Sequence, residues 1–194
     1  MKKILFFIDN LGSGGAQRQI VNIASALKQR GYNVEVLVYQ DYPFYKPLLD
    51  KKEIPVTLID AKSKISRIVR VRKYINKAHA DVVVAFLETP CFIACVSKIG
   101  HKKWKLITNE LSAKLSTFTS RRNKLFNWFE RFSNAKVANS HNAIDMWRKY
   151  YPQYEKKYSV IYNPVSIPQE WVEYPHEYRK NGKLRLTVAA SYQE

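Results

Sequence analysis

The segment Lys3–Ala26 (KILFFIDNLGSGGAQRQIVNIASA) joins an apolar run, a glycine-rich turn and a helix-forming stretch, in that order. The apolar run Ile4–Ile8 predicts a β-strand, and apolar side chains at helical spacing follow the turn. The free N–H groups and the dipole of a helix that starts at such a turn favour a bound anion. We therefore expect the backbone amides of Gly14 and Gly15 to bind a phosphate group. The alternative is that these glycines only form a tight turn.

The glycine turn departs from two common nucleotide-binding motifs. In the dinucleotide motif Gly-x-Gly-x-x-Gly, Gly12 and Gly14 fit the first two positions, but Gln17 occupies the third. Asp41 follows at roughly the separation at which that motif places a ribose-binding acid. A nicotinamide-dependent oxidoreductase or epimerase therefore stays open as an alternative. The Gly-Lys-Ser/Thr sequence of nucleotide hydrolases does not follow Gly15.

The composition indicates one globular domain with a strong positive charge. The 194 residues are 46% hydrophobic, which is enough for a core and argues against wholesale disorder. Cys91 and Cys95 lack the spacing of a zinc site and are expected to be buried thiols. The formal net charge of +17 predicts an anionic partner, such as nucleic acid, acidic lipid or a phosphorylated small molecule.

The sequence gives little sign of a leader or a membrane span. The apolar run after Met1-Lys2-Lys3 is shorter than the ~7–15 residues of a signal peptide core. The most apolar later window, Val82–Val96, contains Glu88 and Pro90 and falls short of the ~20 residues that a span needs. We therefore expect a cytoplasmic protein without a transmembrane anchor.

Apolar runs alternate with amphipathic stretches along the chain. The expected strands are Ile4–Ile8, Val34–Tyr39, Val56–Ile59, Asp81–Phe86, Lys105–Thr108, Lys136–Ala138 and Ser159–Tyr162. The expected helices are Ala16–Arg30, Tyr45–Lys52, Ser63–His79, Pro90–Lys98, Ser120–Phe132 and His141–Tyr150. This alternation predicts an α/β fold with a Rossmann-like, mostly parallel sheet and helices on both faces. Ligands of such sheets bind beyond the carboxyl ends of the strands.

The chain changes character after residue 162. The stretch Asn163–Gly182 is rich in proline and lacks a clear period, which is typical of a linker or crossover. Leu184–Ala190 then predicts a further strand. We expect a Rossmann-like N-terminal lobe over residues 1–162, a crossover over 163–183, and the first strand of a truncated second lobe over 184–194.

Six stretches spread over the chain together match one family pattern. They are Gly14–Arg18 with Ile23-Ala24 and Leu27, Gly31–Val36, Ala80–Val83, Lys136–Ser140, Val160–Val165 and Leu186–Ala190. In their order and spacing they resemble the retaining glycosyltransferases of family four, which share the two-lobed GT-B fold. Gln17 stands where relatives usually carry an acid, and Pro164 replaces a more usual glycine.

The resemblance implies a function and a division of labour between lobes. It covers the first lobe, which in such enzymes mainly holds the acceptor, whereas the second lobe holds most of the nucleotide sugar. It implies transfer of a sugar, with retention, from a nucleotide-sugar donor to a sugar or lipid-linked acceptor, as in bacterial surface polysaccharide synthesis. It implies no metal ion and no cofactor besides the donor substrate. This chain alone is expected to be inactive without its own second lobe.

Candidate site residues lie at expected strand ends and at the first helix. We expect Asn109 and Glu110 to be catalytic, since an amide can bind a sugar hydroxyl and a carboxylate can orient the attacking hydroxyl. The expected acceptor-binding residues are Arg18, Glu88 and Ser140, although Ser140 also fits the cap of the next helix.

Basic residues form a second candidate surface. Arg67, Arg70, Lys73 and Lys77 are expected on one side of a helix, opposite Ile65 and Ile68. Arg121 and Arg122 begin a helix whose Leu125, Trp128, Phe129 and Phe132 are expected to face the core. Such basic helices favour an anionic membrane, which suggests a peripheral position on the inner face of the plasma membrane.

A nucleic-acid-binding module is the remaining alternative, because of the charge and 13 tyrosines. The chain lacks the aromatic-basic signature of the common RNA-binding folds and the spacing of a helix-turn-helix. We therefore expect no nucleic acid partner.

Overall fold

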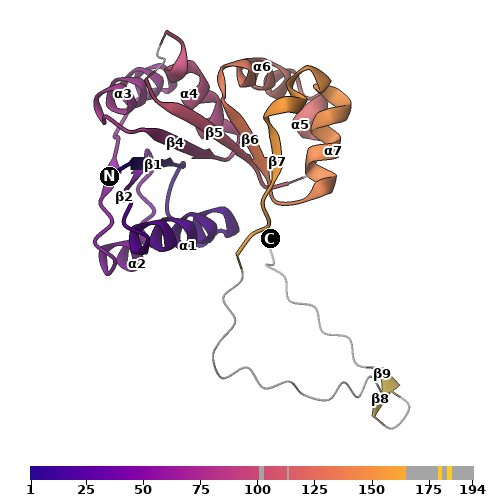
Figure 1. Cartoon of the computed structure of the whole chain (residues 1–194), viewed down its shortest axis with the longest axis horizontal. Coiled ribbons are helices and arrows are strands. Elements are labelled where there is room, and N and C mark those ends of the chain that lie inside the picture. The colour runs from indigo at the N-terminus through magenta and orange to yellow at the C-terminus, as the bar shows by residue number, and fades with distance from the viewer. Residues whose placement is uncertain (101–102, 113, 165–178, 181–182, 185–194) are drawn as a thin grey trace. The chain divides into compact units, whose positions relative to one another are not determined.

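The computed structural model describes residues 1–100, 103–112, 114–164, 179–180 and 183–184. It divides into two units, residues 1–164 and 165–194 (Figure 1). In the second unit, the described residues form β8 (Arg179–Lys180) and β9 (Lys183–Leu184), which pair antiparallel. Apart from Leu184, the expected strand Leu184–Ala190 lies outside the described residues, as does most of the expected crossover.

The first unit is built on a parallel sheet with the order β3-β2-β1-β4-β5-β6-β7 in its described part. Its strands are β1 (Lys3–Phe7), β2 (Asn33–Val38), β3 (Val56–Leu58), β4 (Val82–Phe86), β5 (Lys105–Glu110), β6 (Ala135–Ala138) and β7 (Tyr158–Val160). The central strands are apolar along almost their whole length because helices bury both of their faces. The expected fold class is therefore confirmed.

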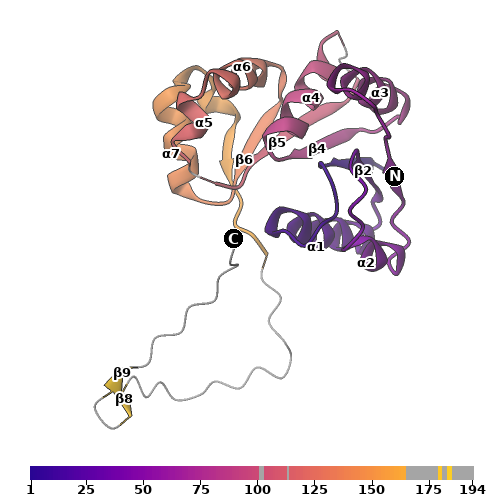
Figure 2. The same ribbon diagram turned by 180° about the vertical axis from the view of Figure 1, so that it is seen from behind.

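Helices cover the sheet in two layers (Figures 1 and 2). They are α1 (Gly15–Gln29), α2 (Lys46–Asp50), α3 (Lys64–Lys77), α4 (Glu88–Lys98), α5 (Ser116–Thr119), α6 (Arg121–Phe129) and α7 (His141–Tyr150), with 3₁₀ turns at Glu130–Phe132 and Pro152–Lys157. The α3, α4 and α6 layer lies on one face, and α1 and α2 lie on the other.

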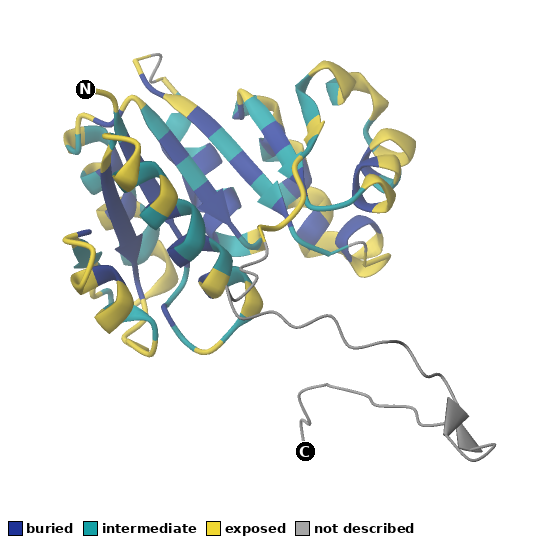
Figure 3. Cartoon of the chain, turned by 60° about the horizontal axis from the view of Figure 1, so that its bottom comes forward, coloured by how far each residue is buried: buried dark blue, intermediate teal, exposed yellow. Residues whose placement is uncertain are grey.

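Each layer has its own hydrophobic core, and the sheet separates the two. Val71 of α3 and Cys95 of α4 belong to the core that contains Phe7. Ile20 of α1 belongs to the core that contains Phe6 on the opposite face. Figure 3 shows this arrangement, with buried residues concentrated in the strands and exposed residues along the outer sides of the helices. Successive side chains of β1 therefore pack alternately into one core and the other.

Local sequence sets the ends of several helices. Ser63 caps α3 by accepting a hydrogen bond from the Ser66 amide, at 3.1 Å. Gly31 follows α1 with a φ of 84°, a left-handed conformation that glycine adopts without strain. The predicted stop of the first helix is therefore confirmed.

The segment predicted as one helix over Ser120–Phe132 is α6 followed by a 3₁₀ turn, and the short helix α5 precedes it. The expected core-facing stripe is wrong in part, because Leu125 is 55% exposed and Trp128 46% exposed. Phe129 and Phe132 do pack against the core. In α3, Ile65 and Val69 are likewise exposed rather than core-facing. In the part of the chain that the structure describes, no helix has the length and apolarity needed to cross a bilayer.

Candidate functional site

A cavity of about 330 Å³ opens at the carboxyl ends of β1, β4 and β5, where a parallel sheet binds its ligands. Asp9 lies just beyond β1, Glu88 begins α4, and Glu110 ends β5. Thr117 of α5 and Asn123 of α6 form the opposite side. Polar side chains from four separate parts of the sequence therefore meet at one edge of the sheet.

The backbone at the start of α4 is strained where it meets the cavity. Leu87 joins β4 to α4 with φ 72° and ψ 156°, a region that residues other than glycine rarely occupy. This conformation reverses the chain and puts Glu88 at the first position of the helix, beside the cavity. Such strain costs about 1–3 kcal/mol and is concentrated at functional sites in proteins. Leu87 is thus a feature that the sequence pattern did not reveal.

Glu110 is a buried carboxylate whose two oxygens have different partners. The Trp147 indole N–H donates to Oε2 at 3.2 Å, and the Ser112 amide donates to Oε1 at 3.2 Å. Burial raises the pKa of Glu110 above its ordinary value, against the opposing effects of Lys136 and these hydrogen bonds. A carboxylate with a raised pKa beside a cavity is a candidate for proton transfer.

Asn109 and Glu110 both line the cavity, as expected of a pair of site residues, but their side chains have different partners. Both residues belong to β5, which extends past the expected end of that strand at Thr108. Successive side chains of a strand point to opposite faces, so the two side chains leave β5 in different directions. The Asn109 amide group instead donates to the Ala85 carbonyl of β4, at 3.2 Å. Glu110 turns toward Trp147, on the side of the α4 and α6 layer.

The floor of the cavity is a buried polar network. Lys136 of β6 pairs with Glu130 at 2.9 Å, and its ammonium lies 3.9 Å from the centre of the Trp147 ring. Burial alone would lower the pKa of Lys136, but the Glu130 carboxylate raises it above its ordinary value. Thr108 donates to the other Glu130 oxygen at 2.7 Å. All four residues are buried, so the network fixes the base of the site.

The glycine turn differs from its expected geometry at Gly14. The Gly14 amide donates to the Gly12 carbonyl at 2.8 Å and is therefore not free for a phosphate. The Gln17 side chain folds back over Gly14, where a Cβ atom would lie 2.2 Å from Gln17 Oε1. Gly15 is exposed, with open space around it, and its N–H belongs to the first turn of α1. Of the two predicted phosphate-binding glycines, Gly15 keeps the expected environment.

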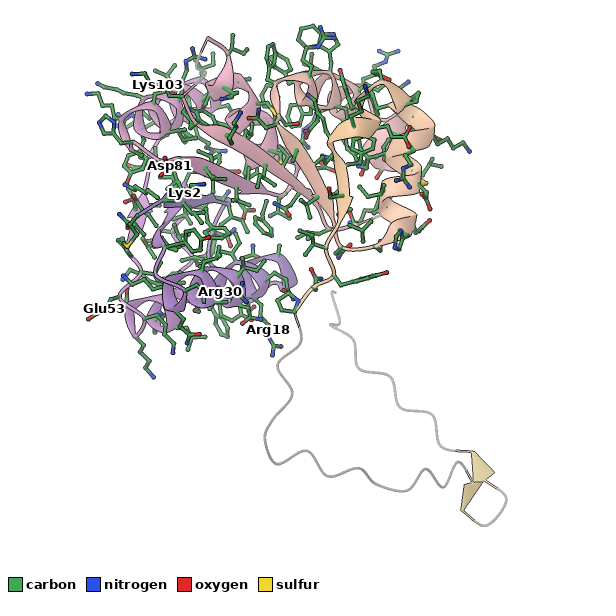
Figure 4. The ribbon with its side chains drawn as sticks, viewed as in Figure 1. Lys2, Arg18, Arg30, Glu53, Asp81 and Lys103 are labelled. Carbon is green, nitrogen blue, oxygen red and sulfur yellow. The ribbon has the colours of Figure 1, made fainter. Side chains whose placement is uncertain are left out.

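Two predicted acceptor-binding residues lie outside the lining of this cavity. Arg18 is exposed on α1, and Figure 4 shows its side chain pointing away from the sheet. Ser140 caps α7, since its hydroxyl oxygen accepts the Ala143 N–H at 3.3 Å. The capping interpretation of Ser140 is therefore confirmed. Glu88 is the member of the predicted acceptor set that lines the cavity.

The predicted basic surface divides into two groups. The Arg67 guanidinium lies 4.3 Å from the centre of the Tyr39 ring, and Arg122 donates to the Thr89 hydroxyl at 2.8 Å. Both side chains therefore contact residues of the cavity lining, and Arg122 remains exposed. The other four predicted residues, Arg70, Lys73, Lys77 and Arg121, are exposed on α3 and α6.

The two cysteines are buried thiols, as predicted. Cys91 and Cys95 are both free, and burial raises the pKa of Cys91 to about 12. Within the described residues, no group of three His, Cys, Asp or Glu side chains could hold a metal ion.

A second cavity, of about 760 Å³, lies between α1 and the other face of β4, β5 and β6. Ile23, Leu27, Val84 and Ile107 give it a largely apolar lining. The smaller cavity, where carboxylates and amides converge, is therefore the better candidate for a polar substrate.

Comparison with known proteins shows which family this sequence resembles. The sequence model of the family described as Glycosyltransferase Family 4 matches residues 13–168. A curated protein of Campylobacter jejuni is 26% identical over 183 residues, which cover 88% of this chain and 48% of that protein. It is named GalNAc-alpha-(1->4)-GalNAc-alpha-(1->3)-diNAcBac-PP-undecaprenol alpha-1,4-N-acetyl-D-galactosaminyltransferase. The chain therefore spans about half the length of the curated relative it matches.

Solved structures share the fold. Anabaena Alr3699/HepE, crystallised with UDP and glucose, has a TM-score of 0.71 and 20% identity, covering 85% of this chain and 45% of that one. The UDP-GlcNAc 2-epimerase from Neisseria meningitidis, bound to UDP-GlcNAc, has a TM-score of 0.61 and 13% identity, covering 84% of this chain and 47% of that one. The expected Rossmann-like lobe of a two-lobed GT-B fold is therefore confirmed.

Proposed function

Because the chain belongs to glycosyltransferase family 4, we propose that it forms the acceptor-binding lobe of an enzyme that transfers a sugar from a nucleotide-sugar donor, with retention. The acceptor is a sugar or a lipid-linked sugar. The observation that carries this proposal is the acid-lined cavity at the carboxyl ends of β4 and β5. A second lobe, which brings most of the donor-binding residues, is needed for turnover.

The charge of the cavity supports a neutral, hydroxyl-rich acceptor. Four carboxylates and two lysines line it, so acids outnumber bases there although the chain as a whole carries a formal charge of +17. The acids are Asp9, Glu88, Glu110 and Glu130, and the lysines are Lys114 and Lys136. Carboxylates repel a phosphate group but accept hydrogen bonds from sugar hydroxyls. The diphosphate of the donor is therefore proposed to bind elsewhere, at the exposed first turn of α1 around Gly15.

Glu110 is proposed to orient the attacking hydroxyl of the acceptor. Its carboxylate lies at the cavity, is held by Trp147 and Ser112, and has a raised pKa. A carboxylate in this position can accept the proton of the attacking hydroxyl as the hydroxyl oxygen bonds to the anomeric carbon. The bond from that carbon to the donor diphosphate breaks on the same face, so the nucleoside diphosphate leaves and the configuration is retained. Glu88, at the start of α4, is proposed to bind a further hydroxyl of the acceptor. Asn109 also lines the cavity, and its amide group holds β5 to β4 through the Ala85 carbonyl.

The donor is proposed to be a nucleotide sugar that acts as substrate, with no metal ion. Two observations on similar proteins support this choice. The Anabaena structure contains UDP and glucose, and the Campylobacter relative is named for transfer onto an undecaprenol-linked glycan. By analogy, we propose that the acceptor here is a bacterial lipid-linked glycan.

A lipid-linked acceptor agrees with the outer surface of the α3, α4 and α6 layer. Leu125 and Trp128 of α6 are exposed there, beside Arg121, and the Arg131 guanidinium lies 3.8 Å from the centre of the Trp128 ring. On α3 the exposed Ile65 and Val69 lie among Arg70, Lys73 and Lys77. We propose that this outer surface rests on the anionic, cytoplasmic leaflet of a membrane.

A transfer assay tests the proposed function. The natural protein is incubated with radiolabelled nucleotide sugars and a panel of free and lipid-linked sugar acceptors. We expect transfer with at least one donor, and a fall in kcat/KM of about 10²-fold or more in Glu110→Gln. Glu155→Gln, which changes an exposed carboxylate that does not line the cavity, is the control and should leave the rate unchanged. Absence of transfer across common donors and acceptors, together with tight NAD binding, would contradict the proposal.

A further inference from the structure

Two polar atoms at the cavity are buried without a hydrogen-bond partner. Among the described residues, Thr117 Oγ1 and Asn123 Oδ1 belong to a small group of buried side-chain atoms with this property. Thr117 is 2% exposed and Asn123 is 7% exposed, and both line the cavity. A buried acceptor without a partner costs about 1–3 kcal/mol, so native proteins rarely keep one without a reason.

The orientation of the Asn123 amide is fixed by its neighbours. Its Nδ2 donates to the Ser116 carbonyl at 3.2 Å and to Glu88 Oε1 at 3.4 Å. An amide flipped by 180° would turn Oδ1 toward these two acceptors and lose both hydrogen bonds. The atom left without a partner is therefore the carbonyl oxygen, which needs a donor.

The helices that carry these residues are held in place. Asn127 donates to the Thr117 carbonyl at 2.9 Å and so ties α6 to α5. The Phe126 ring stacks on Phe92 of α4, with ring centres 4.1 Å apart. The two free oxygens therefore have defined positions in the absence of any ligand, as a preorganised binding site requires.

We propose that Thr117 and Asn123 bind the terminal sugar of the acceptor and determine which sugar is accepted. This inference rests on the proposed function. Asn123 Oδ1 accepts a hydrogen bond from a hydroxyl or amide N–H of the sugar, and Thr117 Oγ1 exchanges one with a neighbouring hydroxyl. The ligand is a neutral sugar rather than a phosphate, because Asp9, Glu88 and Glu110 surround the same cavity.

Two substitutions test this inference in the natural protein. Thr117→Val keeps the shape of the side chain and removes an unpartnered hydroxyl, and Asn123→Ala removes the free carbonyl oxygen. Thr119→Val is the matched control, because Thr119 lies on the same short helix with its hydroxyl bonded to the Leu115 carbonyl and exposed. Each variant is assayed for transfer with the preferred acceptor and with acceptors that lack one hydroxyl.

We expect Thr117→Val to raise the acceptor KM by about 5- to 10-fold, the size of one lost hydrogen bond, with kcat changed less than about 2-fold. Its melting temperature should be unchanged or higher, because the folded protein loses no hydrogen bond. One deoxygenated acceptor should lose affinity with the wild type but not with Thr117→Val, which identifies the hydroxyl that Thr117 binds. Asn123→Ala should show the same selective loss for a different substituent.

Three outcomes separate the inference from the proposed function. Wild-type protein that transfers no sugar overturns the proposed function and the inference with it. Wild-type transfer with unchanged acceptor KM in both variants overturns the inference alone. A lower melting temperature of Thr117→Val with unchanged KM also overturns it, since it shows that the oxygen binds a structural water.

Discussion

Lys136 Nζ lies 2.9 Å from Glu130 Oε1, and both side chains are almost completely buried beneath the cavity. Two buried charges of opposite sign lose their hydration on folding, and their mutual attraction offsets that loss only when both are present. The hydrogen bond from Thr108 and the Trp147 ring complete the surroundings of this pair. The ion pair thus connects β6 to the 3₁₀ turn that follows α6.

Lys136→Met is expected to lower the free energy of unfolding by about 3–5 kcal/mol, because it leaves the Glu130 carboxylate buried without its cation. Urea denaturation followed by circular dichroism measures this change. The double variant Lys136→Met with Glu130→Leu should regain most of the loss, since no unpaired charge is left in it. A double variant at least as unstable as the single one would contradict the account of the ion pair.

Glu110 should make stability depend on pH in a specific direction. Its pKa in the folded protein is raised above the ordinary value of 4.5, mainly by burial, so the folded state binds its proton more tightly than the unfolded state. Its contribution to stability is then fully present below the ordinary pKa and is lost as pH rises through the raised one.

The stability of the wild type minus that of Glu110→Gln should therefore fall as pH rises from 4.5. Chemical denaturation of both proteins in the same buffers gives this difference, and other carboxylates cancel from it. If the stability of the wild type minus that of Glu110→Gln instead increases with pH, the pKa of Glu110 is lowered in the folded protein. The hydrogen bonds from Trp147 and Ser112, which lower this pKa, would then outweigh burial, which raises it.

Much of the fold could be predicted from the sequence, because the signals are local. Apolar runs located all the strands of the sheet, and Gly31 ended α1 as expected. Strand ends are less well defined by composition. The polar side chains of Asn109 and Glu110 suggest a loop, yet both residues belong to β5 and pair with β6.

The candidate site was predicted less well than the fold. Glu88 and Glu110 follow from the rule that ligands bind at strand ends, but Thr117 and Asn123 enter the cavity through tertiary packing. Asn123 and Asn127 lie four residues apart on one helix, a spacing that could have indicated a buried polar face but that the sequence analysis did not use. Neither the composition of the sequence nor its hydrophobic periodicity indicates the strained backbone at Leu87.

The two glycines at the start of α1 should respond differently to alanine. Gly14→Ala places a Cβ 2.2 Å from Gln17 Oε1, so Gln17 must move and lose its bonds to Asp9 and Asn10. We expect a loss of about 1 kcal/mol in unfolding free energy. Gly15→Ala meets open space and should cost nothing, since alanine favours a helix. Equal losses in the two variants would contradict the described position of Gln17.

Membrane binding should depend on the outer surface of α3 and α6. Leu125→Ser and Trp128→Ser should each weaken binding to anionic vesicles, and Lys73→Gln should weaken it about fivefold at low salt. Vesicle sedimentation measures the affinity. Leu48→Ser is the control, because Leu48 is similarly exposed but belongs to α2 on the other face of the sheet. Equal losses for Leu48→Ser and Leu125→Ser would contradict the proposed orientation.

The most direct test of the acceptor site is a crystal structure of the natural protein with its acceptor sugar bound. The account predicts density for a sugar ring in the acid-lined cavity, with hydroxyls within hydrogen-bonding distance of Glu110 and Asn123. A sugar bound instead in the apolar cavity between α1 and β4, with the acid-lined cavity empty, would contradict it.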